Sequence, residues 1–275
     1  MSWHFGVLYK YCIYKNNDEY FNNQSSLLTN LSLRYRDLGD FDNAVKYAEK
    51  SLIINNCQEK NNLNFVRQYI VAILNLSLIY IDFNLNEKAK NLIDDLIIEY
   101  QELLTKYINL ELDTEMSILL DTFFSNVFYI YSKNNDYKFI INTANKINII
   151  KRKCTKENIN LFIEVAYAHL NENYDYKNIE TILDEPLKII NTLIDINEEL
   201  WMEDFIRIYN LLATSYYIGG KILESKNYHE MILLKINKND KYKENFKFYY
   251  EDSIGNLKKF ENDEIINKSL EFAKK

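Results

Sequence analysis

The side chains best suited to catalysis or metal binding are few and scattered along this chain. Its three histidines are His4, His169 and His229, too far apart in sequence to suggest a metal site or a Cys-His nucleophile pair. His-Glu-x-x-His, Cys-x-x-Cys and Gly-rich phosphate motifs do not occur. The acidic pair Asp94-Asp95 is more typical of a solvated helix face than of an acid–base dyad. We therefore expect no catalytic residues, no metal and no cofactor.

Charge and hydropathy argue against two further classes of function. The 33 basic and 40 acidic residues give a net charge of −7, whereas nucleic-acid binding needs a basic surface to neutralise phosphates. No segment approaches the roughly 18 apolar residues of a membrane span, and residues 1–15 lack the basic leader of a signal peptide. Three widely spaced cysteines, Cys12, Cys57 and Cys154, are typical of reduced thiols. We expect a cytoplasmic protein that binds neither nucleic acid nor membrane.

The elements that would position a site are predicted to be helices. One Pro and five Gly leave few helix breakers, and apolar residues recur at i, i+3 and i+4. Residues 30–52 predict two amphipathic helices joined by a turn at Gly39-Asp40. Small residues such as Ala44 and Ser51 would let these helices approach closely. A hairpin this short cannot bury its apolar faces alone, so the pattern predicts stacked copies.

Copies of this hairpin recur along the chain. In the second copy Asn75 repeats Asn30, at an offset of 45 residues (75 minus 30). The third has Ile140 in the place of Ala44, and the fourth is degenerate. Pro186 in the fourth suggests that a fresh helix starts there. The four copies after the first lie at 73–97, 124–147, 159–194 and 209–233.

The first hairpin resembles a tetratricopeptide repeat (TPR). That family has a large apolar residue, then Leu-small, Tyr, Gly-Asp-aromatic, Ala and a small residue. The matching positions are Leu28, Leu31-Ser32, Tyr35, Gly39-Asp40-Phe41, Ala44 and Ser51. Ala48 stands where the family has an aromatic residue, and Asn56 where it has Pro. The resemblance implies an all-α, TPR-like α-solenoid, a right-handed superhelix of about five helical hairpins plus a C-terminal capping helix pair.

The expected organisation has three parts. Residues 1–24 form an N-terminal cap, 25–245 the TPR-like repeats and 246–275 the C-terminal capping helices. The repeats lie at about 25–69, 70–120, 121–158, 159–205 and 206–245.

The resemblance also implies a concave groove lined by the first helix of each hairpin. The residue before the Leu-small pair faces that groove in this family. It is Asn30, Asn75 and Asn126 in repeats one to three, and in repeat five Asn210 lies one place before the corresponding Leu211. A carboxamide offers a donor and an acceptor, so a row of them suits the backbone of an extended peptide. Asn is also abundant in this chain, so the row has a compositional explanation as well.

Neighbouring side chains would add specificity to such a row. Arg36 and Arg207 could each take a carboxylate from a side chain or a C-terminus. The predicted peptide- or partner-binding residues are Asn30, Arg36, Asn75, Asp82, Asn126, Tyr129, Arg207, Asn210 and Tyr217.

Long repeats with Asn on their first helices resemble the RRNPP-type peptide-pheromone regulators of Gram-positive bacteria. The resemblance covers roughly residues 25–270 and implies an intracellular domain that binds a short re-imported peptide through such Asn residues. Members of that family carry a helix-turn-helix or a three-helix bundle before the repeats. The 24 residues before the first repeat are too few for either. We therefore expect a stand-alone sensor domain, a truncated relative or an adaptor.

Three functions stay open at this stage. The first is a non-catalytic module that binds a peptide or protein partner, for example in quorum sensing or regulation. The second is a scaffold or homodimer that uses its convex face or its aromatic-rich N-terminus, which includes Trp3, Phe5 and Tyr9. The third, an enzyme, would need ionisable groups that converge inside the groove. The recurring Asn residues favour the first.

Overall fold

The computed structural model describes residues 18–56, 63–108, 114–172 and 176–273, and every regular element in these ranges is helical. The N-terminal aromatic residues of the scaffold hypothesis, and most of the predicted N-terminal cap, lie outside the described residues. The chain divides into two compact units, Met1–Asp136 and Tyr137–Lys275. We describe each unit by itself.

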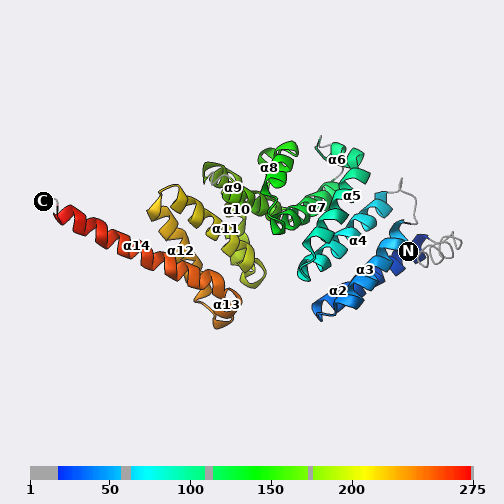
Figure 1. Ribbon diagram of the computed structural model, residues 1–275, viewed down its shortest axis with the longest axis horizontal. Coiled ribbons are helices and arrows are strands. Elements are labelled where there is room, and N and C mark those ends of the chain that lie inside the picture. The colour runs from blue at the N-terminus through cyan, green and yellow to red at the C-terminus, as the bar shows by residue number, and fades with distance from the viewer. Residues whose placement is uncertain (1–17, 57–62, 109–113, 173–175, 274–275) are drawn as a thin grey trace. The chain divides into compact units, whose positions relative to one another are not determined.

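Unit 1 is a stack of helical hairpins (Figure 1). Helix α4 packs against α2, α3, α5 and α7, and α3 packs most closely on α2. The first helices α2, α4 and α7 therefore form one layer, and the second helices α3 and α5 form the other. The helices are α2 (Asp18–Asp37), α3 (Phe41–Asn56), α4 (Leu63–Asp82), α5 (Asn86–Glu99), α6 (Gln101–Ile108) and α7 (Thr114–Lys133).

Small residues lie where the helices of unit 1 meet. Ala44 and Ala89 are fully buried, as the sequence pattern predicts. Ser51 of α3 is also buried, and its Oγ lies 2.9 Å from Oγ of Ser25 and 2.8 Å from Oγ1 of Thr29, both on α2. These hydroxyls satisfy one another, so close approach of the two helices leaves no polar group of this trio without a partner. The predicted all-α stack of hairpins is confirmed.

The turns between first and second helices share one backbone design. At the first turn the N–H of Asp40 donates to the carbonyl of Tyr35 and the N–H of Gly39 to that of Arg36, both at 2.9 Å. This Schellman motif needs a residue with positive φ, which Gly39 provides at 72°. The same pair of bonds closes the turns that follow Tyr80, Tyr131 and Tyr216, with positive φ at Asn84, Asn135 and Gly220.

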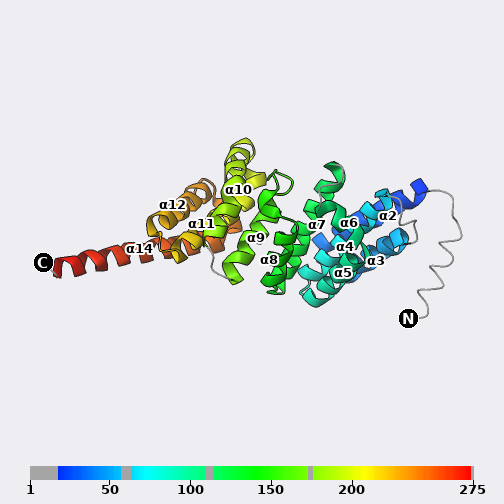
Figure 2. The ribbon, with the colours of Figure 1, turned by 90° about the horizontal axis from the view of Figure 1, so that it is seen from above.

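Unit 2 continues the alternation of first and second helices (Figure 2). Helix α9 packs against α8, α10 and α11, and α12 packs between α11 and α14. The closing segment, which was predicted to be a helix pair over 246–275, is one long helix, α14, and the six-residue α13 precedes it. The elements are α8 (Tyr137–Lys146), the 3-10 turn η1 (Ile149–Lys151), α9 (Ile159–Glu172), α10 (Tyr176–Ile196), α11 (Glu198–Ile218), α12 (Ile222–Ile236), α13 (Asp240–Asn245) and α14 (Lys247–Ala273).

The predicted helix start at Pro186 is wrong, because α10 runs through that residue without a break. Pro186 itself is buried. It lies on the side of α10 that also buries Ile179, Ile182, Leu183 and Ile190. Packing of this apolar side therefore outweighs the loss of one backbone hydrogen bond at the proline.

Candidate functional site

The nine predicted binding residues all lie on first helices, but they divide between the two units. We call the two sets the unit 1 face, on α2, α4 and α7, and the unit 2 face, on α11 with its neighbours α9 and α14. Each face is fixed only within its own unit. The unit 1 face has Asn30, Arg36, Asn75, Asp82, Asn126 and Tyr129, and the unit 2 face has Arg207, Asn210 and Tyr217.

On the unit 1 face the structure brings two predicted residues together as an ion pair. Nε of Arg36 on α2 donates to Oδ2 of Asp82 on α4. Their side chains are 28% and 38% exposed, so the pair lies at the surface of the layer. A second pair joins the next two first helices, where Nη1 of Arg67 lies 2.6 Å from Oε2 of Glu115. These pairs tie α2 to α4 and α4 to α7.

The asparagines of the unit 1 face differ in environment. Asn30 is exposed, whereas Asn75 and Asn126 are half-buried. Nδ2 of Asn126 donates to the carbonyl of Thr122 at 2.9 Å, one turn earlier in α7. One turn later lies Tyr129, whose ring centroid is 5.0 Å from Nζ of Lys133.

On the unit 2 face Arg207 is held by two residues of α9. Nη2 lies 2.5 Å from Oε1 of Glu164, and Nη1 donates to Oδ1 of Asn160 at 3.0 Å. Glu164 is only 3% exposed. Burial would lower the pKa of Arg207, but the charge and hydrogen bond of Glu164 outweigh it and raise that pKa. The cation is therefore fixed, and it neutralises a buried carboxylate that the sequence did not single out.

The other groups of this face differ in burial and in whether their polar atoms have hydrogen-bond partners. Burial raises the pKa of Asp204, one turn before Arg207, although the Arg207 charge acts to lower it. Leu211, at the family's groove position, is 4% exposed and belongs to the core. Asn210 is half-buried, and its Oδ1 is buried with no hydrogen-bond partner among the described residues. The hydroxyl of Tyr217 accepts from Nζ of Lys259 on α14 at 2.5 Å.

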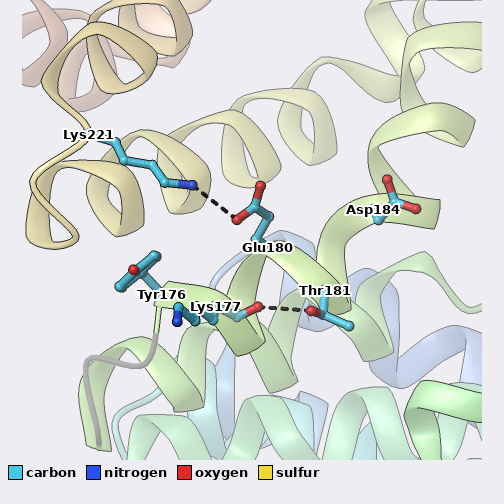
Figure 3. Close-up of a pocket in the computed structure, with 6 residues that line it drawn as sticks. All are labelled: Tyr176, Lys177, Glu180, Thr181, Asp184 and Lys221. Carbon is cyan, nitrogen blue, oxygen red and sulfur yellow. Dashed lines mark hydrogen bonds and ion pairs between the residues drawn. The ribbon is translucent and has the colours of Figure 1, made fainter.

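A pocket that the sequence did not predict lies on α10 and the turn before α12 (Figure 3). Its volume is about 640 Å³. Its lining is a stripe along the start of α10 plus one residue from the turn: Tyr176, Lys177, Glu180, Thr181, Asp184 and Lys221. No sequence motif marks it, because the stripe becomes a pocket only when the turn packs beside it.

Two charged groups of this pocket, Lys221 and Glu180, pair with each other, and Asp184 pairs with a residue outside the pocket. Nζ of Lys221 lies 3.5 Å from Oε2 of Glu180 and 5.6 Å from the ring centroid of Tyr176. The hydroxyl of Tyr216 donates to Oε1 of Glu180 at 2.8 Å, and burial followed by this bond raises the pKa of the tyrosine. Nζ of Lys188 lies 2.6 Å from Oδ2 of Asp184. The pairs at Glu180 brace α10 against α11 and the turn before α12.

In the part of the chain that the structure describes, no three His, Cys, Asp or Glu side chains gather as a metal ion requires. His229 is buried on α12, and its Nδ1 lies 3.1 Å from Oγ of Ser253. None of the described helices is both long enough and apolar enough to cross a membrane.

Comparison with solved structures identifies the fold. The chain is similar to TPR-like repeats described as those of a Podosopora anserina kinesin light chain, with a TM-score of 0.57 and 15% identity over 78% of this chain and 97% of that one. A point-mutant form of those repeats gives a TM-score of 0.53 and 13% identity over 83% of this chain and 100% of that one. Comparison with protein-family models finds no match, and neither does comparison with curated proteins. The chain therefore has a TPR-like α-solenoid fold.

Proposed function

We propose that this chain is a non-catalytic binding module whose first helices hold an extended peptide or a segment of a partner protein. The observation that carries the proposal is the placement of Asn75 and Asn126. Each stands five residues before the tyrosine whose carbonyl closes its turn (80 minus 75, 131 minus 126), on first helices that pack together. Both side chains are half-buried.

This placement suits recognition of a peptide backbone. A half-buried carboxamide is restrained by its neighbours, but part of it is still exposed to a ligand. It can accept a hydrogen bond from one backbone N–H and donate one to a backbone carbonyl. Two such groups on adjacent helices could bind successive parts of one extended segment. The TPR-like fold supports this use, because stacked repeats present extended surfaces to protein partners.

The test is calorimetry with N-acetylated, C-amidated peptides of about eight residues each, supplied as a pool. Replacing both Asn75 and Asn126 with Ala should weaken binding by about 1 to 3 kcal/mol per lost hydrogen bond. Asn91→Ala is the matched control, because Asn91 is exposed on the second helix α5. Equal affinity in all three proteins, or no heat with the native chain, would refute the proposal.

A narrower form of the proposal is peptide-pheromone sensing in the cytoplasm. It rests on the resemblance of the Asn-bearing first helices to RRNPP-type regulators. Cys154 is a buried thiol, which agrees with a reducing compartment. Short exported peptides encoded beside this gene are the probes to use. Binding of one such peptide but not of its scrambled sequence would support sensing, and equal binding of both would refute it.

A second candidate function, as a scaffold or homodimer, is supported by a separate observation. Large apolar side chains on α12 are exposed, with Leu223 at 67% and Leu234 at 59%. Light scattering of the native chain and of a Leu223→Ser, Leu234→Ser variant tests it. A native dimer that becomes a folded monomer would favour the scaffold, and a native monomer would exclude self-association.

A further inference from the structure

The arginines of the first helices are already paired with carboxylates of the protein. Four arginines lie on the first helices as far as the structure describes them. Each has a carboxylate within ion-pair distance: Arg34 with Asp37, Arg36 with Asp82, Arg67 with Glu115, and Arg207 with Glu164.

The Arg207 pair is the most costly to open. Glu164 is 3% exposed, and its partner guanidinium also binds Asn160 on the same helix. A ligand carboxylate that captured Arg207 would leave Glu164 buried without this cation, which costs more than an exposed ion pair returns. The same exchange at Arg36 would release Asp82, so the ligand would only replace one carboxylate by another.

The uncharged groups of these faces differ from the arginines, because no ion pair has to open before they can bind a ligand. Asn75 and Asn126 are half-buried and retain surface. Oδ1 of Asn210 has no hydrogen-bond partner among the described residues, but the atom is buried and therefore presents no surface to a ligand. Hydrogen bonds to carboxamides require no counter-charge, and they match the N–H and C=O groups of a peptide backbone.

We infer that the partner segment is uncharged where it touches the first helices, and that it is held through backbone amides rather than through acidic side chains or a C-terminal carboxylate. This inference rests on the proposed function and names its ligand class. It replaces the expectation from sequence that Arg36 or Arg207 receives a ligand carboxylate. Binding through neutral groups also implies a weak dependence on salt, because screening acts on charges.

The test compares three pools of capped peptides with the full chain. One pool contains only uncharged residues, the second has one Asp or Glu per peptide, and the third one Lys or Arg. We expect the uncharged pool to bind best, with less than about a twofold change in affinity between about 50 and 500 mM salt. Tighter binding of either charged pool, with a steep loss in salt, would overturn the inference but leave the proposed function standing. No binding of any pool would overturn both.

A charge-releasing variant gives an independent readout. Asp82→Asn frees Arg36 in a pair that is partly exposed, so the fold should tolerate it. The acidic pool should then gain about tenfold in affinity relative to the uncharged pool measured on the same variant. Asp37→Asn is the control, because its side chain is 65% exposed and its partner Arg34 is already 82% exposed. If Asp82→Asn brings no gain for acidic peptides, the internal pairs do not decide ligand charge, and the inference fails.

Discussion

Nδ1 of His229 on α12 lies 3.1 Å from Oγ of Ser253 on α14, and both residues are buried. Packing of α14 on α12 therefore encloses an imidazole. Burial lowers the pKa of His229 below its ordinary value of 6.5, while the nearby Asp252 carboxylate acts to raise it. Burial therefore favours the neutral ring more in the folded chain than in the unfolded chain.

This preference predicts an acid-dependent loss of stability in unit 2. Below about pH 6.5 the unfolded chain binds a proton at His229 that the folded chain does not, so stability falls until the pH passes the lower folded-state pKa. Urea unfolding at about pH 7.5 and about pH 5 measures the effect. His229→Gln should lose less stability across this window than the native chain, because Gln does not titrate. Equal losses in the native chain and the variant would mean that the pKa of His229 does not change on folding.

The Arg207–Glu164 pair predicts a strong coupling between α11 and α9. Arg207→Met should destabilise the chain by about 3 kcal/mol, because it leaves the Glu164 carboxylate buried without its arginine. Adding Glu164→Gln should recover most of that loss. Arg34→Met is the control, since its exposed pair with Asp37 should contribute close to nothing. Denaturant unfolding of the native chain, the two single variants at this pair and the double variant gives the coupling energy. Additive effects of the two changes would contradict the pairing.

The surroundings of Gly219 and Gly255 predict that an alanine has opposite effects on stability at the two positions. A Cβ at Gly219 would lie 2.9 Å from Cγ of Tyr176, so Gly219→Ala should cost about 1 to 2 kcal/mol. Gly255 within α14 has open space, and Gly255→Ala should stabilise by about 0.5 to 1 kcal/mol. Thermal melts compare the two. A Tyr176→Ala background should remove the cost at Gly219, and a cost that persists there would contradict this explanation.

Local sequence patterns were enough to predict the hairpins, because a short stretch of consecutive residues encodes each hairpin. Gly39 at the turn and small residues such as Ala44 at the helix contact indicate such a hairpin directly. The turns at Asn84 and Asn135 use a residue other than Gly for positive φ, yet they repeat the same two backbone bonds. The fold class is therefore readable even where the motif is degenerate.

Contacts between hairpins were not predictable in the same way. Arg36 and Asp82 were both expected to face a ligand, but they are separated by 46 residues (82 minus 36) and bind each other. Pairing of this kind depends on how far one repeat rotates against the next, which no local pattern encodes. Glu164 was missed for a related reason: a buried carboxylate has no sequence signal apart from its partner.

Close packing at Ala44 predicts that this position tolerates no larger side chain. Ala44 on α3 is fully buried in a cluster with residues of α2 and α4, so Ala44→Leu should cost about 1 to 3 kcal/mol by overpacking. Glu49→Leu on the same helix is the control, because Glu49 is exposed. Thermal melts that show no loss for Ala44→Leu would mean that the hairpin contact is not as tight as described.

The most direct test of the central claim is to map where a bound peptide touches the chain. A capped, uncharged peptide that carries a photoreactive group, once selected by calorimetry, can be cross-linked to the native protein and the attachment sites read by mass spectrometry. We expect cross-links on the first helices, at α4 and α7 near Asn75 and Asn126 or at α11 near Asn210. Cross-links confined to second helices such as α5 and α12, or to the pocket at Tyr176, would contradict the proposal that first helices hold the ligand.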